Sequence, residues 1–414
     1  MITIFKNKKT RYFLCACFSL CSAVLAAKYI QFNKSEKTFP TNEMISSDTT
    51  KTEINHSFLQ GMWVPYIDLD VSKSKNTKEA FEKRFQSIVE TAKNHNINTL
   101  IVHVRSHSDA LYPSKIFPTS HILTGVQGEN INFDPLKYMV ETAHANNLKF
   151  HAWINPLRIS SVSVPEKICN SNPCKSKAFG DKLIKHQGGL IYNPAYPEVR
   201  KLVCDGVKEI ADNYNIDAIH FDDYFYPEPE NMLSEDNAYQ HYIKNSFGKS
   251  VQNLEDWRKE NINLLIKEVH STIKNVNPNI EFGISPPGNT EKCSKTGIDI
   301  SAWLKEGYVD YLCPQIYWSL KFAEMPFEKA LNNWINLTQN NPVKLYVGLA
   351  LYKACTDADC GTWENDQSVL AKELDLVHQN NASGTMIYSA NYFEKLKHTE
   401  EIKYLDEKLK DFHG

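Results

Sequence analysis

The sequence predicts an α/β fold of the (β/α)8 TIM-barrel type, preceded by an export segment and a disordered linker. Strand-like apolar runs alternate with helical patterns eight times along the chain. Such alternation is typical of a parallel sheet, and eight units close a barrel. A doubly wound open sheet is the alternative, but no glycine-rich phosphate loop follows any predicted strand. The 42% hydrophobic and 23% charged content agrees with a globular domain that has a sizeable core.

The eight strands and eight helices are predicted from apolar periodicity of two and of 3.6 residues. The predicted strands are 61–69, 98–105, 149–155, 217–225, 280–286, 309–318, 344–352 and 385–391. The predicted helices are 77–95, 135–146, 197–214, 254–275, 300–305, 327–338, 366–379 and 394–410. Together they define a barrel domain at residues 58–414.

The N-terminal segment has the pattern of an export signal. A basic stretch at residues 6–11 precedes an apolar run from Tyr12 to Ala27 that ends in small residues. Because the apolar run is shorter than the roughly 20 residues that span a bilayer, we interpret residues 1–27 as a cleaved signal peptide, with an uncleaved signal-anchor as the alternative. Residues 28–57 are polar, lack periodicity and are predicted to form a linker. The expected location is the periplasm, cell envelope or extracellular space, with membrane contact only through an uncleaved N-terminus.

Two closely spaced cysteine pairs lie in loop-like sequence of the barrel domain. They are Cys169 with Cys174, and Cys355 with Cys360. In an oxidising compartment such pairs are candidates for small-loop disulfides, and free loop thiols are the alternative.

Charge and histidine content exclude some classes of function. Lys plus Arg is 46 against 49 Asp plus Glu, a formal net charge of −3, so no basic surface for nucleic acid is expected. His103, His151 and His220 fall on three different strands and should point inward. Since those strands carry no carboxylate at ligand spacing, hydrogen-bonded core histidines are favoured over a metal site, and no cofactor is expected.

Polar and aromatic residues gather where the predicted strands end. Active sites of such barrels lie at this end, in the loops that follow the strands. Because side chains alternate along a strand, Arg105, Trp153, Asn155, Asp222 and Tyr224 should face the barrel axis. We therefore expect Asp222 at the floor of a cleft, facing Arg105.

Six long motifs resemble one known family. They are VHVRSHSDALYPS (102–114), FHAWINP (150–156), YNPAYPEVR (192–200), IHFDDYFYP (219–227), FGISP (282–286) and VDYLCPQIYW (309–318). Through them, the span of residues 61–393 resembles the glycosyl hydrolase-like family 10 proteins of bacterial envelopes. The resemblance implies a (β/α)8 barrel and glycosidase activity, with peptidoglycan glycan strands, intact or stripped of their peptides, as substrate.

A glycosidase normally needs two carboxylates, one as proton donor and one as base or nucleophile. Asp222 is the first candidate, with a structural ion pair to Arg105 as the alternative. Asp223 follows it directly, should point elsewhere, and is assigned to orienting a neighbour or binding a sugar hydroxyl, or else to capping a loop. Asp109 is the first candidate for the second carboxylate. The other candidates for that role are Glu364, Glu291 and Asp68.

Aromatic and amide side chains at the strand ends suit sugar binding. The predicted substrate-binding residues are Arg105, Trp153, Asn155, Tyr224, Gln315, Tyr317, Trp318 and Asn391. For the aromatic residues, packing inside the barrel is the alternative. Since the second carboxylate is not evident, a non-catalytic glycan-binding envelope or cell-division accessory protein on the same barrel remains the rival function.

Overall fold

The computed structural model describes residues 58–75, 77–233, 236–246 and 250–412. The predicted export segment and linker at 1–57 lie outside the described residues and remain predictions. No helix within the described ranges is long and apolar enough to cross a bilayer.

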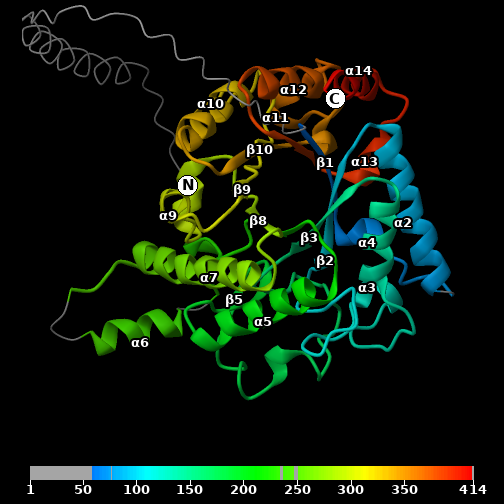
Figure 1. Ribbon diagram of the computed structural model, residues 1–414. Helices are drawn as coiled ribbons and strands as arrows, with labels where there is room; N and C mark the ends of the chain where they lie inside the picture. The colour runs from blue at the N-terminus through cyan, green and yellow to red at the C-terminus, as the bar shows by residue number, and fades with distance from the viewer. Residues whose placement is uncertain (1–57, 76, 234–235, 247–249, 413–414) are drawn as a thin grey trace, which may run out of the picture. The chain divides into compact units, whose positions relative to one another are not determined.

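Eight parallel strands form a closed barrel, which confirms the predicted fold (Figure 1). They are β1 (Leu59–Val64), β2 (Thr99–Arg105), β3 (Lys149–Ile154), β7 (Ala218–Phe221), β8 (Glu281–Ile284), β9 (Tyr311–Leu312), β10 (Lys344–Leu349) and β11 (Gly384–Ile387). Each pairs with the strand before and after it in this order, and β11 pairs with β1 to close the ring. Most strands end earlier than predicted: residues 66–69, for example, form a 3-10 turn, η1 (Tyr66–Leu69), instead of continuing β1. The residues predicted as strand ends therefore lie in the loops that follow the barrel.

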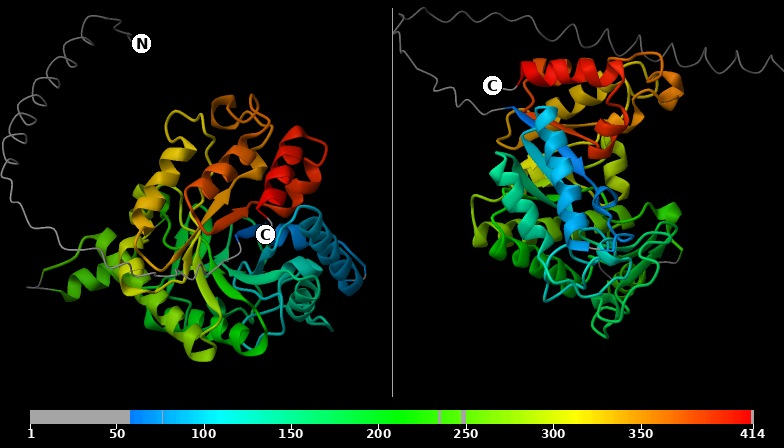
Figure 2. Two further views of the ribbon diagram at one scale, coloured as in Figure 1. Left: turned by 45° about the horizontal axis from the view of Figure 1, so that its top comes forward. Right: turned by 90° about the vertical axis from the view of Figure 1, so that its right-hand side faces the viewer.

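Helices surround the barrel in both views of Figure 2. They are α2 (Thr77–Asn94), α4 (Pro135–Ala145), α5 (Pro197–Asn213), α7 (Leu254–Val276), α9 (Ile300–Glu306), α10 (Phe327–Thr338), α12 (Val369–Gln379), α13 (Ala390–Lys395) and α14 (Glu400–Asp411). Side-chain caps begin several of them: Asp134 accepts from the Lys137 amide at α4, and Asn253 accepts from the Asp256 amide at α7. The last predicted helix is in fact two, because the chain leaves α13 and Thr399 caps a new helix, α14.

Shorter elements occupy the connections between these strands and helices. They are the helices α3 (His121–Thr124), α6 (Asn237–Asn245), α8 (Thr290–Lys295) and α11 (Ala358–Gly361), and the 3-10 turns η2 (Pro173–Lys175), η3 (Pro229–Asn231) and η4 (Leu351–Lys353). The sequence did not predict them, since each is too short to show a helical period.

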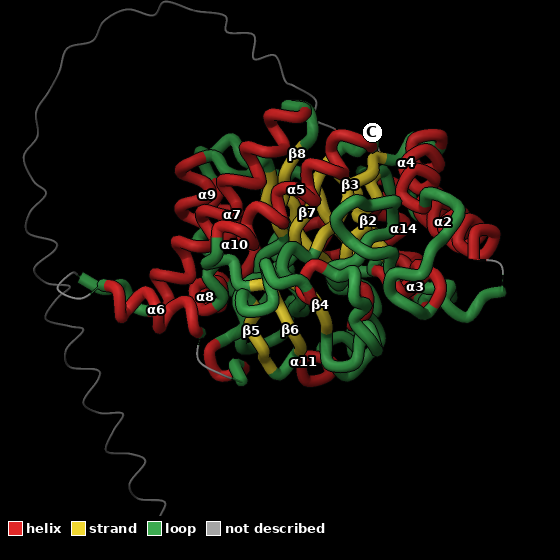
Figure 3. Tube along the Cα trace, turned by 90° about the horizontal axis from the view of Figure 1, so that it is seen from below, coloured by secondary structure: helices red, strands yellow, loops and turns green. Residues whose placement is uncertain are grey.

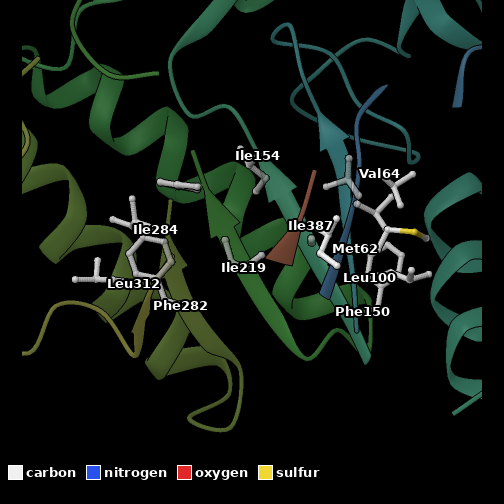
Figure 4. Close-up of a cluster of buried hydrophobic side chains, with 14 of the residues drawn as sticks. Met62, Val64, Leu100, Phe150, Ile154, Ile219, Phe282, Ile284, Leu312 and Ile387 are labelled. Atoms are coloured by element: carbon white, nitrogen blue, oxygen red, sulfur yellow. The ribbon is translucent and has the colours of Figure 1, made fainter. Parts of the chain in front are cut away.

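The hydrophobic core has two layers, as expected for strands covered by helices outside and filled inside. Outward-facing side chains such as Met62, Ile219 and Phe282 pack against the helices (Figure 4). Inside the barrel a second cluster includes Trp63, Trp153, Tyr311 and Tyr346. Large rings fill this interior so closely that a Cβ on Gly283 would lie 2.0 Å from the Tyr311 ring. The barrel is therefore closed below the level of the loops.

An antiparallel sheet of three strands is inserted between β3 and α5. It consists of β4 (Arg158–Ser160), β5 (Leu183–His186) and β6 (Gly189–Tyr192), in the order β4-β6-β5 (Figure 3). This sheet was not predicted from the sequence, because strands of three or four residues have too few positions to show an alternation of apolar and polar side chains. A backbone bridge between His186 and Met232 ties its tip to the loop that follows β7.

The predicted disulfides are not formed in the structure, where Cys169, Cys174, Cys355 and Cys360 are free. The Cys174 side chain packs into the hydrophobic core, whereas the Cys169 thiol contacts the Ser171 hydroxyl at 3.3 Å. Close spacing in sequence thus does not turn the two thiols of this pair toward one another. Cys355 and Cys360 are exposed and both adopt left-handed backbone, with φ of 60° and 61°.

Candidate active site

A cavity of about 910 Å³ lies at the carboxyl ends of the barrel strands. Its walls come from the connections after β1, β3, β7, β8, β9, β10 and β11, and from the turn between β5 and β6. The lining side chains include Trp63, Tyr66, His103, Trp153, Arg158, His186, Asp222, Asp223, Tyr224, Glu228, Gln315, Tyr317, Tyr352 and Tyr388. This size and this mixture of rings and a few charged groups are typical of a ligand site.

Asp222 lies at the cavity floor, only 3% exposed, directly after β7 ends. Its Oδ2 accepts hydrogen bonds from the indole Nε1 of Trp153 at 3.0 Å and from the side-chain amide of Asn155. Its Oδ1 is 3.3 Å from the backbone nitrogen of Tyr224. Three donors from two strand ends therefore fix the carboxyl group in one orientation.

Burial, and then the neighbouring charge of Asp223, raise the pKa of Asp222 to about 7. Arg158 and the hydrogen bonds from Trp153 and Tyr224 act in the opposite direction but do not outweigh them. Asp222 is thus a carboxyl group that carries its proton near neutral pH.

Asp223 and Glu228 also line the cavity. Asp223 was expected to point away from Asp222, but β7 ends at Phe221 and strand alternation no longer separates the two side chains. Burial raises the pKa of Asp223, and a hydrogen bond from Gln315 opposes this shift. Glu228 was not predicted as a site residue, although it immediately follows the motif at 219–227.

Arg105 does not face Asp222, contrary to prediction. The pairing register between β2 and β3 shifts between His103 and Arg105, and this bulge turns the arginine away from the barrel axis. Its guanidinium carbon lies 4.4 Å from the Phe117 ring centroid, and the side chain is 2% exposed. Arg105 is a buried packing residue outside the cavity.

Arg158, the first residue of β4, supplies the cationic side chain of the cavity. Its Nε donates to the backbone oxygen of Ser106 at 2.8 Å. Its guanidinium carbon lies 4.9 Å from the Tyr224 ring centroid and 5.9 Å from that of Tyr66. Arg158 is not among the residues predicted for the site, although it comes two residues after the FHAWINP motif.

Asp109 is not among the residues that line the cavity. It is fully buried, and its Oδ2 accepts from His121 Nδ1 at 2.8 Å and from Gln127 Nε2 at 3.1 Å. Burial alone would raise the pKa of Asp109, but the hydrogen bond and charge of His121 outweigh it, and the pKa falls below its usual value. In this position Asp109 holds a loop together and does not reach a substrate.

The other candidate carboxylates, Glu364, Glu291 and Asp68, do not line the cavity either. Asp68 is bonded to the backbone nitrogen of Asn391 at 3.2 Å and to its side-chain amide. This contact joins η1, the turn after β1, to the first turn of α13.

The predicted sugar-binding residues divide into two groups. Trp153, Tyr224, Gln315 and Tyr317 line the cavity. Asn155, Trp318 and Asn391 do not line the cavity, although Asn155 donates a hydrogen bond to Asp222. Six further lining aromatics were not predicted as binding residues: Trp63, Tyr66, Phe225, Tyr226, Tyr352 and Tyr388.

The three inward histidines are hydrogen-bonded core residues, as favoured from the sequence. His103 Nε2 lies 3.0 Å from Asn155 Oδ1, while His151 and His220 contact the Tyr311 hydroxyl at 3.0 and 2.8 Å. Burial lowers the pKa of His151 to about 3 and lowers those of the other two as well, so all three are neutral. Within the described part of the chain, no group of three or more His, Cys, Asp or Glu side chains could hold a metal ion.

A family model described as glycosyl hydrolase-like 10 matches residues 59–362, which include the barrel strands up to β10 and most of the cavity wall. The chain belongs to the glycosyl hydrolase-like 10 family. It is 33% identical over 364 residues to glycosyl hydrolase YngK of Bacillus subtilis, covering 81% of this chain and 69% of that protein. It is 30% identical over 373 residues to glycosyl hydrolase DigH of Escherichia coli K12, covering 83% of each. The protein is accordingly a glycosidase.

Solved structures share the barrel at low sequence identity. The glycoside hydrolase domain of PgaB (BpsB) from Bordetella bronchiseptica superposes with a TM-score of 0.59 at 11% identity, over 85% of this chain and 99% of that one. A β-galactosidase from Marinomonas ef1 gives a TM-score of 0.56 at 10% identity, over 85% of this chain and 59% of that one. At such identity the likeness supports the fold alone.

Proposed function

We propose that the protein is an exported glycosidase that cleaves peptidoglycan glycan strands, with Asp222 as the proton donor. One observation carries the catalytic assignment. Asp222 is a buried carboxyl group with a pKa raised to about 7, fixed by three donors at the floor of an aromatic-lined cavity. General acids of glycosidases need such a raised pKa.

The hydrogen bonds around Asp222 support an assignment of its proton to one carboxyl oxygen. Oδ2 accepts from both Trp153 and Asn155, so its lone pairs are engaged. Oδ1 has only the long contact to the Tyr224 amide at 3.3 Å. The proton is therefore placed on Oδ1, from which it is delivered to the oxygen of the leaving sugar.

Asp223 is the proposed second carboxylate. It lines the same cavity, and its charge is among the causes that keep Asp222 protonated. As a carboxylate it can stabilise the positive charge that develops on the sugar ring, or activate the attacking group. Glu228, which lines the same cavity, is assigned to sugar hydroxyls.

Two features support a wall polysaccharide as substrate. The predicted export segment would deliver the enzyme to the compartment that holds such strands. The rings of Tyr66, Tyr224, Tyr317 and Tyr388 surround the cavity and offer stacking surfaces for the apolar faces of successive sugars.

The test compares wild type with Asp222→Asn on purified peptidoglycan glycan strands, with new reducing ends as the readout. Asp222→Asn keeps the shape of the side chain and removes its proton, so we expect turnover to fall by about 10²–10⁴-fold with strand binding retained. Asp223→Asn should also reduce turnover. Asp212→Asn, an exposed position of α5, is the matched control and should behave as wild type.

The variant Asp109→Asn tests whether Asp109 is the second catalytic carboxylate, as predicted from the sequence, or a structural residue, as its place in the structure suggests. Since Asp109 is outside the cavity, its loss should lower stability more than it lowers the turnover of folded protein. Wild-type protein that binds the strands without ever cleaving them would instead support the rival function, a glycan-binding accessory protein.

A further inference from the structure

We propose that Arg158 is a specificity residue that binds a carboxylate carried by the sugar at the cleavage site. The inference rests on the proposed glycosidase function and names the substrate chemistry more narrowly. In peptidoglycan that group is the lactyl carboxylate of muramic acid, which is free only where the stem peptide has been removed. The enzyme would accordingly select acidic strands over strands in which this carboxylate is an amide.

The position of Arg158 is fixed before any ligand binds. Its Nε donates a hydrogen bond to the backbone oxygen of Ser106, and the rings of Tyr224 and Tyr66 lie beside the guanidinium. These contacts hold the stem and one edge of the planar group. The two terminal nitrogens remain for a partner in the cavity.

No carboxylate of the described chain forms an ion pair with Arg158. Arg158 is also the one lysine or arginine among the described residues that line the cavity, beside Asp222, Asp223 and Glu228. A half-buried guanidinium without a counter-ion is unfavourable unless something else supplies the negative charge. The carboxyl groups of the cavity act on Arg158 only at a distance, without an ion pair, so we assign the direct partner of the guanidinium to a bound substrate.

The chemistry of the group favours a carboxylate over sugar hydroxyls. A guanidinium presents parallel N–H donors that match the two oxygens of a carboxylate, and such charge-assisted bonds are stronger than those to neutral groups. Hydroxyls have other partners in the cavity, such as Gln315 and Glu228. Without Arg158, the acidic side chains would repel an acidic strand, so the arginine also offsets that repulsion.

A second role for Arg158 must be distinguished by experiment. Its charge lowers the pKa of both Asp222 and Asp223, and it could serve only to adjust these two groups. In that case its removal would change cleavage of every substrate equally and would move the basic limb of the pH profile to higher pH. A binding role makes the effect depend on the substrate's carboxylate.

The experiment uses one preparation of peptide-free glycan strands in two forms. In one form the lactyl carboxylates are free, and in the other they are converted to methylamides by carbodiimide coupling. The full-length protein, Arg158→Gln, Arg158→Lys and the control Lys305→Gln, which removes an exposed charge on α9, are compared by kcat/KM on both forms. Unfolding curves show which variants are folded.

We expect wild type and Lys305→Gln to prefer the free carboxylates by about 10–100-fold. Arg158→Gln should lose most of this preference, chiefly through KM, and Arg158→Lys should retain part of it because the charge remains. If Arg158→Gln does not fold, a partial loss of the preference for free carboxylates in Arg158→Lys is the result that supports the inference. Equal cleavage of both forms by wild type, or an equal loss on both forms in the variants, would overturn the inference. Wild type that cleaves neither form would instead overturn the proposed function.

Discussion

Asp222 and Asp109 are the same residue type, both buried, yet their surroundings shift their pKa values in opposite directions. For Asp109, the hydrogen bond and charge of His121 outweigh the burial, and the carboxylate is stabilised. For Asp222, the donors are a neutral indole and a neutral amide, and a second carboxylate is adjacent. The balance of burial against partner charge therefore assigns Asp222 to proton transfer and Asp109 to structure.

The raised pKa of Asp222 predicts the pH dependence of cleavage. Since the proton donor must carry its proton, kcat/KM should fall as pH rises through about 7. Asp223→Asn removes a charge that raises this pKa, so in the residual activity of that variant the basic limb should move to lower pH. Measured pH–rate profiles on glycan strands test both statements. A basic limb in the same place in Asp223→Asn would show that the two carboxyl groups do not interact.

Strand β2 and helix α5 are joined at the buried Arg105. A Cβ on Gly206 of α5 would lie 2.0 Å from Arg105 Nη1 and 2.6 Å from the Phe117 ring, so only glycine allows this approach. The bulge in β2 turns the Arg105 side chain toward α5, and Gly206 of α5 leaves room for it.

Gly206→Ala should therefore destabilise the protein, although alanine is normally the better helix former. We expect a loss of about 1–3 kcal/mol in the free energy of unfolding, the range for overpacking a core. Urea denaturation measures it, with Lys208→Ala on the exposed face of the same helix as the control, which should change little. Unchanged or higher stability in Gly206→Ala would contradict the packing described here.

Helices α12 and α14 meet at two buried acids. Glu401 accepts hydrogen bonds from the Val369 and Leu370 amides at the start of α12. Both side-chain oxygens of Glu373 are buried without a hydrogen-bond partner in the described structure. Burial, and then the charges of Glu401 and Asp359, raise the pKa of Glu373 well above its usual value, with Lys353 opposing.

This shift makes stability depend on pH in a defined direction. Below the unfolded-state pKa of about 4.3, Glu373 is protonated in both states and contributes no pH dependence. Above it, ionisation favours the unfolded chain until the folded-state pKa is reached, so stability is lost over that window. The Tm of Glu373→Gln relative to wild type should therefore be higher at pH 8 than at pH 4, whereas Glu90→Gln on the surface of α2 should show no such trend. A difference that does not vary with pH would mean that Glu373 is ionised in the folded protein.

At the scale of the whole molecule, the barrel and its inserted sheet form one compact unit at His56–Gly414. All carboxylates of the cavity, and the donors that orient them, belong to this unit. We therefore expect a chain that begins at His56 to fold and to cleave soluble glycan strands with the same kcat/KM as the full chain. Thermal unfolding and a cleavage assay check this, and a large loss of either property would show that residues 1–55 contribute to the domain.

The predicted signal at residues 1–27 can be checked separately. Protein recovered from the envelope of expressing cells should begin near Ala27 or Lys28, as shown by N-terminal sequencing. A chain recovered with Met1 and the membrane fraction would favour the signal-anchor alternative, and recovery in the cytoplasm alone would contradict export.

The barrel and the place of Asp222 could be predicted from the sequence, because both follow from local patterns. Eight repeats of apolar periodicity define the strands and helices, and parallel strands bring their carboxyl ends to one face. Asp222 follows the apolar run of β7 directly, so the sequence predicts its position at the end of the barrel where the cavity lies.

The partners of Asp222 were decided only by the tertiary structure. A bulge of one residue turned Arg105 out of the barrel, and a short inserted sheet supplied Arg158 in its place. The pairing of Asp109 with His121, and the common cavity of Asp222, Asp223 and Glu228, depend likewise on where strands end and how loops pack. Periodicity records which residues are buried, whereas a pKa or an ion pair depends on contacts between segments distant in sequence, and those exist only once the chain has folded.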